Sequence, residues 1–143
     1  MTTRRLKDIF DLMQIEVFSL CDAATIDAAG KLNVLGAFDT IWSAQIPVVY
    51  PQCAIALRLR FDNIEKGEHR VMVNLVDIDG KHVIPTANGA INVVFPNEQK
   101  SGSANLVLNI QMLRLEKYSE YSIDLAVDGR SEMSLPLFIR ERQ

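Results

Sequence analysis

Residues 121–139 read YSIDLAVDGRSEMSLPLFI, and this stretch decides the fold class. Apolar residues take every second position on both sides of Asp128-Gly129, which is typical of strands with one buried face. Asp-Gly between two such runs favours a tight hairpin turn, because glycine accepts positive φ. The stretch therefore predicts an antiparallel hairpin, and its alternating apolar positions are Tyr121, Ile123, Leu125, Val127, Met133, Leu135, Leu137 and Ile139.

The same period of two continues through most of the chain from residue 16 onward. About eight antiparallel strands with one apolar side each need a second sheet to cover them, so we predict an all-β fold. The expected architecture is an antiparallel β-sandwich of about 7–9 strands, of immunoglobulin-like kind. We expect strands 54–62 and 69–77 to form one hairpin through the loop 63–67. The other predicted strands cover 89–95 and 105–112, and two less regular ones, with apolar residues on both faces, cover 16–26 and 31–42.

Tyr121 opens its strand directly after a charged turn. This arrangement resembles the tyrosine corner of immunoglobulin-like sandwiches, in which the hydroxyl group bonds to upstream backbone. Tyr118 is the weaker candidate for the same role. The stretch thus supports the sandwich prediction.

Residues 1–14 follow a helical period instead. We expect a short N-terminal amphipathic helix of about three turns, which is too short to be stable alone in water. This predicts an N-terminal amphipathic extension, residues 1–14, and a single β-sandwich domain, residues 15–143. Three interpretations of the extension are open: it caps an open end of the domain, it is a disordered tail, or it is exchanged between subunits. Its apolar face consists of Leu6, Ile9, Phe10 and Met13.

Length and charge exclude several classes of protein. The 143 residues, 16.1 kDa, fit one domain, and 48% hydrophobic residues exclude a disordered chain. A formal charge of -3 argues against binding nucleic acid by neutralising phosphates. We find no signal peptide and no apolar run long enough for a membrane helix, so we expect a cytoplasmic protein without a nucleic-acid or membrane partner. Cys21 and Cys53 are then buried free thiols, with a disulfide between them as the alternative.

The segment 20–41, LCDAATIDAAGKLNVLGAFDTI, is followed by Ile46-Pro47. It resembles a family of short, stand-alone bacterial proteins of unknown function that share a Cys-Asp pair, a Gly-Lys-Leu-Asn-x-Leu-Gly-x-Phe-Asp hairpin and a hydrophobe-Pro step. The pieces at 56–61, 67–70 and 76–80 fit the same pattern. The resemblance covers roughly residues 16–140 and leaves out the start of the chain. It implies an immunoglobulin-like sandwich and a bacterial source, and it brings no activity or catalytic residue.

The usual chemical motifs are missing from the sequence. There is no phosphate-binding glycine loop and no zinc-ligand spacing, so we expect no cofactor and no metal. The histidines His69 and His82 are expected to be solvated. Asp22 and Asp39 could form an acid–base pair, but we expect each to bond loop backbone or an arginine instead.

Arg58, Arg60 and Arg70 lie on the polar faces of the predicted hairpin 54–62/69–77. If they project from the same side, they form a patch for a phosphate, a sulfated sugar or an acidic partner. Because glutamates lie in the same loop, a solvated face with cross-strand ion pairs is the favoured interpretation.

Outward apolar residues point to self-association. Trp42, Met72 and Val76, together with Leu6, Ile9 and Phe10 of the extension, are the expected contact residues. The leading functional hypothesis is therefore a non-enzymatic protein-interaction or assembly module with an unknown protein partner. The alternative is a small anionic-ligand binder that uses the arginine-bearing face. The third hypothesis is an enzyme with an acidic cleft.

Overall fold

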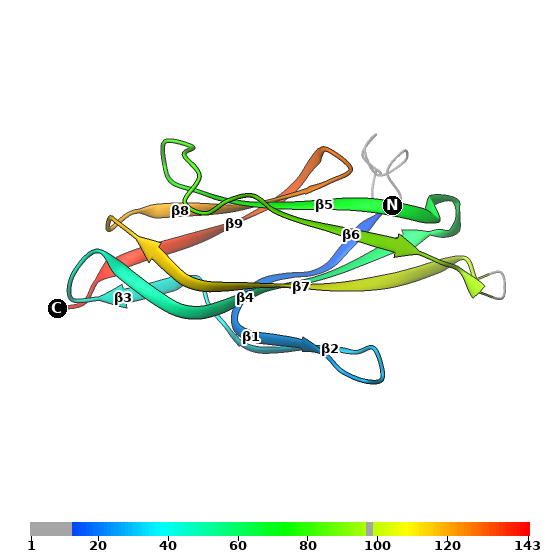
Figure 1. Ribbon diagram of the computed structural model, residues 1–143, viewed down its shortest axis with the longest axis horizontal. Coiled ribbons are helices and arrows are strands. Elements are labelled where there is room, and N and C mark those ends of the chain that lie inside the picture. The colour runs from blue at the N-terminus through cyan, green and yellow to red at the C-terminus, as the bar shows by residue number, and fades with distance from the viewer. Residues whose placement is uncertain (1–12, 97–98) are drawn as a thin grey trace, which may run out of the picture.

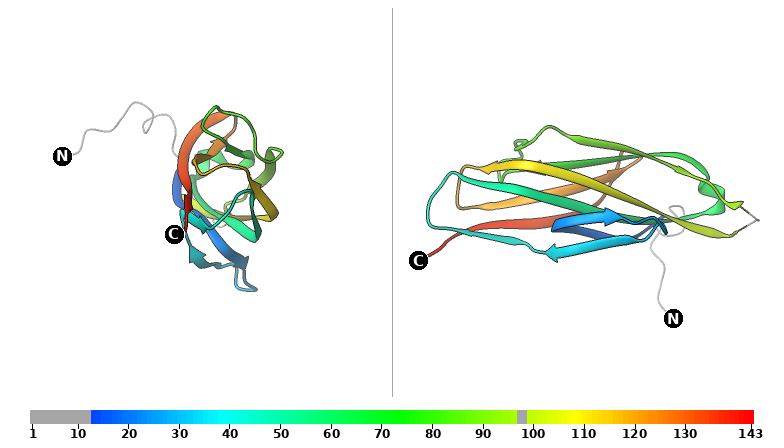
Figure 2. Two further views of the ribbon diagram at one scale, coloured as in Figure 1. Left: turned by 90° about the vertical axis from the view of Figure 1, so that its left-hand side faces the viewer. Right: turned by 60° about the horizontal axis from the view of Figure 1, so that its bottom comes forward.

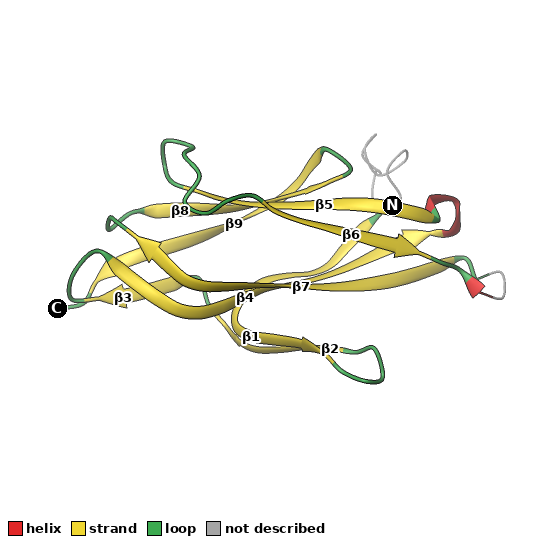
Figure 3. Cartoon of the chain, viewed as in Figure 1, coloured by secondary structure: helices red, strands yellow, loops and turns green. Residues whose placement is uncertain are grey.

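The computed structural model describes residues 13–96 and 99–143. Within these residues, nine strands form two sheets that pack face to face as a β-sandwich (Figure 1). The strands are β1 (Gln14–Ile26), β2 (Leu32–Ala37), β3 (Thr40–Ser43), β4 (Val48–Asp62), β5 (Gly67–Val76), β6 (Ala87–Val93), β7 (Ser101–Leu115), β8 (Glu120–Val127) and β9 (Arg130–Glu141). One sheet has the order β2-β1-β4-β7 and the other β3-β9-β8-β5-β6. We call them the four-stranded and the five-stranded sheet; short loops join almost all strands (Figure 3).

The stretch 121–139 forms the predicted hairpin. β8 is buried at every second residue, and β8 pairs with β9 in antiparallel register up to Val127 and Arg130. Asp128 and Gly129 have φ angles of 52° and 78°, the left-handed geometry that a tight hairpin turn requires. The predicted β-sandwich is thus confirmed, with its core between the inward faces of both sheets.

The predicted tyrosine corner is also present. The Tyr121 hydroxyl donates to the Lys117 carbonyl at 3.4 Å and lies 3.3 Å from the Lys117 amide, from which it accepts. Tyr118 instead donates to the Ser43 carbonyl at 3.0 Å and so fastens β3. Tyr121 is therefore the corner residue, as in immunoglobulin-like sandwiches.

Two expectations about strand pairing are wrong. The segment 31–42 is not one strand: it divides at Phe38-Asp39, so that β2 and β3 belong to different sheets. The Phe38 amide donates to the Leu20 carbonyl at 3.0 Å, and the Asp39 carbonyl accepts from the Phe138 amide at 2.7 Å, so this dipeptide bridges the two sheets. β3 then runs parallel to β9, and the sandwich is mixed rather than wholly antiparallel.

Strands β4 and β5 do not form a hairpin either. β4 pairs with β1 and β7, whereas β5 pairs with β6 and β8. Between them, a 3₁₀ turn, η1 (Asn63–Glu65), carries the chain across from one sheet to the other. Asp62 starts this turn with a capping box, because its carboxylate accepts from the Ile64 amide at 3.2 Å and Glu65 accepts from the Asp62 amide at 2.8 Å.

Strand β1 reverses direction partway along its length. It pairs with β4 from Gln14 to Cys21 and then turns back, so that its second half and β2 form a hairpin outside the sandwich (Figures 1 and 2). We call residues 22–37 the folded-back hairpin. Its turn is fastened to β7, because the Asn105 side-chain amide donates to the Gly30 carbonyl at 3.0 Å.

The folded-back hairpin covers part of the outer face of the four-stranded sheet. Ala54 and Ala56 point outward from β4, yet they are 1% and 0% exposed. They form a small second core with Cys21, against which Ala24 and Leu32 of the hairpin pack. Cys53 lies in the main core on the opposite face of the same sheet. Both cysteines are free, so the disulfide alternative does not hold.

The predicted N-terminal helix falls almost entirely outside the described residues. Of its apolar face only Met13 is described; it is buried in the main core, and β1 begins at the next residue. Leu6, Ile9 and Phe10 lie outside the described residues. No helix in the described part of the chain is long and apolar enough to cross a membrane.

Candidate functional site

Arg58 and Arg60 share one carboxylate on the outer face of the four-stranded sheet. Their Nε atoms donate to the two oxygens of Glu16, each at 2.8 Å. Arg58 also donates to Asn105 at 3.1 Å, and Arg60 to Ser101 at 3.1 Å. The hydrogen bond from Arg60, joined by the one from Arg58, holds the pKa of the Glu16 carboxyl below its ordinary value. Both guanidinium groups therefore already have protein partners.

The third arginine of the expected patch lies on the other side of the sandwich. Arg70 is an exposed outward residue of β5 in the five-stranded sheet, 4.0 Å from the Glu68 carboxylate. The three arginines cannot project from one face, because β4 and β5 belong to different sheets. The geometry gives no support to an anion site built from all three.

Asp22 and Asp39 hold two different hydroxyl groups. Asp22 accepts from the Tyr50 hydroxyl at 2.5 Å, and this hydrogen bond raises the pKa of Tyr50 to about 12. The Tyr50 ring stacks on Phe38 with its centroid 5.1 Å away. Asp39 accepts from the Thr40 hydroxyl at 2.7 Å. Each carboxylate thus bonds a hydroxyl group instead of the loop backbone or arginine that we expected. The two carboxylates have different partners, which gives the acidic-cleft hypothesis no support.

His69 is not the solvated residue that we expected. Its side chain is only 13% exposed and stacks on Phe61 with the ring centroids 4.4 Å apart. Its Nδ1 atom lies 2.6 Å from Asp128, and its Nε2 atom lies 2.5 Å from the Glu65 carbonyl. Burial lowers the pKa of His69, but the hydrogen bonds to these two acceptors outweigh it and raise the pKa above its ordinary value. With both nitrogens engaged, His69 connects the ends of the two sheets; His82 is exposed, as expected.

Three of the residues expected to make contacts between subunits, Trp42, Met72 and Val76, lie within the described part of the chain. All three are on the outer face of the five-stranded sheet. Met72 and Val76 point outward from β5, between buried inward neighbours, and Met72 is 37% exposed. Trp42 points outward from β3, after the buried Ile41, and is 54% exposed. Since β9 and β8 lie between β3 and β5, Trp42 stands roughly 14 Å across the sheet from the other two.

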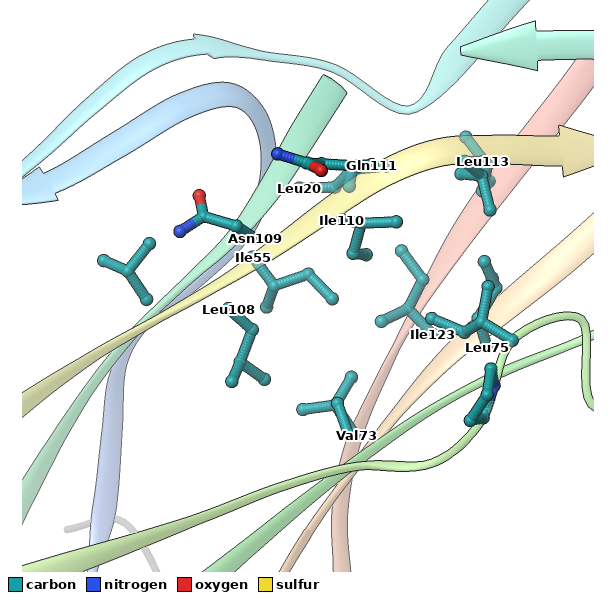
Figure 4. Close-up of a pocket in the computed structure, with 15 residues that line it drawn as sticks. Leu20, Ile55, Val73, Leu75, Leu108, Asn109, Ile110, Gln111, Leu113 and Ile123 are labelled. Atoms are coloured by element: carbon teal, nitrogen blue, oxygen red, sulfur yellow. The ribbon is translucent and has the colours of Figure 1, made fainter. Parts of the chain in front are cut away.

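An apolar cavity of about 370 Å³ lies between the edge strands β6 and β7. Ile55, Val73, Leu75, Leu108 and Ile123 point into it from both sheets (Figure 4). This cavity could not be predicted from the sequence, because most of its lining residues are ordinary inward positions of strands. Only the pairing of the strands reveals that β6 and β7 are the two sheet edges on that side.

Two packed sheets, the crossover at Phe38-Asp39 and the tyrosine corner place the protein in the class of immunoglobulin-like β-sandwiches. The chain belongs to the family of unknown function DUF6941, which it matches over residues 16–140. No match is found among curated proteins. Among solved structures, the chain is similar to a β-glucuronidase from glycoside hydrolase family 2, with 20% identity and a TM-score of 0.36. That likeness covers 64% of this chain and only 11% of the enzyme, and it carries no argument about activity.

Proposed function

We propose that this protein is a non-enzymatic assembly module that binds a second copy of itself through the outer face of the five-stranded sheet. The observation that supports this most directly is that Trp42, Met72 and Val76 all lie on this one face. An isologous pair would bring the same face of each copy together, as in most symmetric dimers.

The centre of this face has the composition of an interface core. Where β5 and β8 pair, their six outward positions at 72, 74, 76, 122, 124 and 126 carry one charged residue, and interface cores are depleted in charge. The charged outward residues Glu68, Arg70 and Glu120 lie at the ends of the same two strands. The charged residue where they pair, Asp124, accepts from the hydroxyls of Ser122 and Ser134, each at 2.6 Å. Beside it, the side-chain oxygen of Asn74 is buried without a hydrogen-bond partner in this structure.

The size of the face also fits a dimer. Five strands spaced by about 4.8 Å, with about eight residues rising by about 3.3 Å each, span roughly 600 Å² before side-chain relief is counted. A stable interface buries about 800 Å² on each partner. The flat area of the face therefore corresponds to the lower end of the range for specific interfaces, about 600 Å² per partner, and protruding side chains such as Trp42 add to it.

We further propose that the module works in the bacterial cytoplasm. Two buried free cysteines support a reducing compartment, and the resemblance of segment 20–41 supports a bacterial source. The formal charge of -3 supports a protein partner rather than nucleic acid.

The test measures mass in solution by light scattering at about 100 μM protein. We expect the wild type at twice its chain mass and Met72→Glu at the monomer mass, because a charge at the centre of an apolar contact opposes association. Val49→Glu is the matched control: Val49 is 39% exposed, against 37% for Met72, and projects from the four-stranded sheet. A monomeric wild type, or equal dissociation of both variants, overturns the proposal. Deleting residues 1–12 in parallel measures what the N-terminal extension adds.

A further inference from the structure

We propose that Trp42 of one copy docks in a hollow on the outer face of the five-stranded sheet of a second copy. The hollow lies on β5 and β6 beside the turn between β8 and β9, and its lining includes Glu68, Arg70, Met72, Asn88 and Asp128. We call it the β5–β6 hollow. This inference rests on the self-association proposed above and names the residues that anchor it.

The β5–β6 hollow is open to solvent. The side chains of Glu68 and Arg70 are 63% and 83% exposed, and Met72 is 37% exposed. Two glycines, Gly89 and Gly129, also line the hollow and have no side chain that could fill it. The volume of the hollow is about 530 Å³, whereas the heavy atoms of a tryptophan side chain need roughly 300 Å³ if each takes the space of a water molecule. The hollow therefore has room for an indole ring.

Trp42 and the β5–β6 hollow lie at opposite ends of a diagonal across the same face. In the register of β8, Trp42 lies two residues before Glu120, whereas Met72 is level with Ala126. The eight residues between these levels, 118 to 126, correspond to roughly 26 Å along the strands, and the three strand spacings from β3 to β5 correspond to roughly 14 Å across them. Figure 1 likewise shows β3 and β6 toward opposite ends of the sandwich. A two-fold axis through the midpoint of this diagonal exchanges its ends, so each Trp42 meets the hollow of the other copy.

The lining of the hollow offers contacts that suit an indole ring. Met72 presents a thioether, which packs favourably against aromatic rings, and Arg70 presents a guanidinium group that can lie over the ring face. Arg70 can turn toward the ring because its ion pair with Glu68 is loose, at 4.0 Å. The Asn88 side chain donates to the Thr86 carbonyl at 3.4 Å, so its own carbonyl oxygen is the atom that can accept from the indole N–H. Tryptophans in such pockets are typical hot spots of interfaces.

Charge complementarity also favours this pairing. The hollow contains two carboxylates, those of Glu68 and Asp128, and one guanidinium group, that of Arg70, so negative charge is in excess by one. Arg140 stands next to Trp42 in register, on the neighbouring strand β9 and on the same face. Docking of Trp42 therefore brings the Arg140 guanidinium toward the Glu68 carboxylate of the other copy.

Trp42 is held in place by the rest of its own chain. The adjacent Ile41 is buried in the main core. On the other side, the Ser43 carbonyl accepts from the Tyr118 hydroxyl at 3.0 Å and from the Arg142 amide at 2.9 Å. Because the short strand that carries Trp42 is fastened at both neighbours, docking of the ring costs less conformational entropy than docking of a loose loop.

Fluorescence tests the contact directly, because Trp42 is the single tryptophan of the chain. We expect the emission of the wild type to move to shorter wavelength, and its quenching by acrylamide to fall, as the protein is concentrated from about 0.1 to about 100 μM. The change should follow the dimer fraction measured by sedimentation equilibrium. An emission that stays constant while the wild type dimerises overturns the inference.

Mixing two variants tests which residues meet. Trp42→Ala lacks the ring and Asn88→Trp fills the hollow, so neither homodimer has an intact contact. Their mixed dimer keeps one, because Trp42 of the Asn88→Trp chain enters the open hollow of the Trp42→Ala chain. We expect the dissociation constant of each homodimer to rise at least about thirtyfold and the mixed dimer to be at least about fivefold tighter than either. Native mass spectrometry separates the three dimers by mass.

Asn92→Trp is the matched control, because Asn92 projects from the same strand on the same outer face without lining the hollow. Its homodimer should stay within about threefold of the wild type, and mixing it with Trp42→Ala should give no excess of mixed dimer. A purely statistical mixture of Trp42→Ala and Asn88→Trp, beside a wild-type dimer that Met72→Glu dissociates, overturns the docking and leaves the self-association standing. A monomeric wild type overturns both proposals.

Discussion

The two sheets of the sandwich differ in what lies on their outer faces. On the four-stranded sheet, the folded-back hairpin packs over Ala54 and Ala56, and Glu16 holds Arg58 and Arg60 beside it. On the five-stranded sheet, no described segment of the chain covers the outer face, and Met72 remains in contact with solvent. One face is thus covered by the chain itself, and the other is left uncovered by the described residues.

This difference shows that outward alternation along a strand does not by itself mean exposure. Ala54 and Ala90 are both outward alanines, and only the first is buried. What separates them is a second layer formed by residues 22–37, which packs over Ala54 and leaves Ala90 uncovered. The variants below test how much stability depends on that layer.

The largest loss of folding stability is expected from a charged side chain placed beneath the folded-back hairpin. Ala54→Glu buries a carboxylate among Cys21, Ala24 and Leu32 with no cation in this small core, so we expect a loss on the order of 3–5 kcal/mol. Ala90→Glu places the same group on the uncovered face and should change stability by no more than about 0.5 kcal/mol. Urea unfolding followed by circular dichroism measures both. Equal losses would contradict the distinction between the two faces.

A smaller effect is expected at the bend of the folded-back hairpin. Gly36 has a φ of 70°, and a Cβ there would lie 2.6 Å from a carboxylate oxygen of Asp22. Gly80 has a φ of 84° with nothing within 4 Å of its added Cβ. Gly80→Ala should therefore cost about 1 kcal/mol from backbone strain alone, and Gly36→Ala about 2–3 kcal/mol because Asp22 must also move. Thermal unfolding of both variants gives the comparison, and an equal cost would show that Asp22 moves freely.

The smallest effect concerns the ion pairs beside the hairpin. Glu16 and its two arginines are about one-third exposed, so Glu16→Gln should cost only about 1 kcal/mol at pH 7. Because the folded-state pKa of Glu16 is lowered, its stabilising effect is present above the unfolded value of 4.5 and is lost as pH falls through the folded value. The wild type should therefore lose its advantage over Glu16→Gln between about pH 5 and pH 3.

The control for this titration is the exposed pair of Arg114 and Glu116, whose side chains are 60% and 61% exposed. Glu116→Gln should leave stability unchanged to within a few tenths of a kcal/mol at either pH, because exposed pairs contribute little. A pH-independent difference between the wild type and Glu16→Gln would show that the carboxylate charge is not what matters.

Alternation and turn chemistry were sufficient to predict the sandwich. Asp128-Gly129 and Tyr121 each determine the backbone geometry within a few residues of themselves. The hairpin and the tyrosine corner could therefore be predicted from short stretches of sequence. The burial of His69 could have been predicted in the same way. His69 lies two residues before the buried Val71 on β5, so both side chains point inward.

Pairing between strands could not be predicted in this way. Alternation identifies the inward face of a strand but not the sheet to which the strand belongs, which is why β4 and β5 were expected to be neighbours. The cavity between β6 and β7 could not be predicted for the same reason, because it depends on which strands lie at the edges of the sheets. One sequence signal was present: Leu20 and Cys21 are adjacent and both apolar, which is typical of a strand covered on two sides. Both residues are indeed buried.

The positions of the two thiols make the opening of each layer of the protein separately measurable by thiol reactivity. Burial raises the pKa of Cys21 and raises that of Cys53 to about 11, so neither reacts as a thiolate while it remains covered. Cys21 lies beneath the hairpin and Cys53 within the main core, on opposite faces of one sheet. A disulfide reagent added to the native protein would therefore reach Cys21 when the hairpin lifts and Cys53 when the sandwich opens, timing the two events in one molecule.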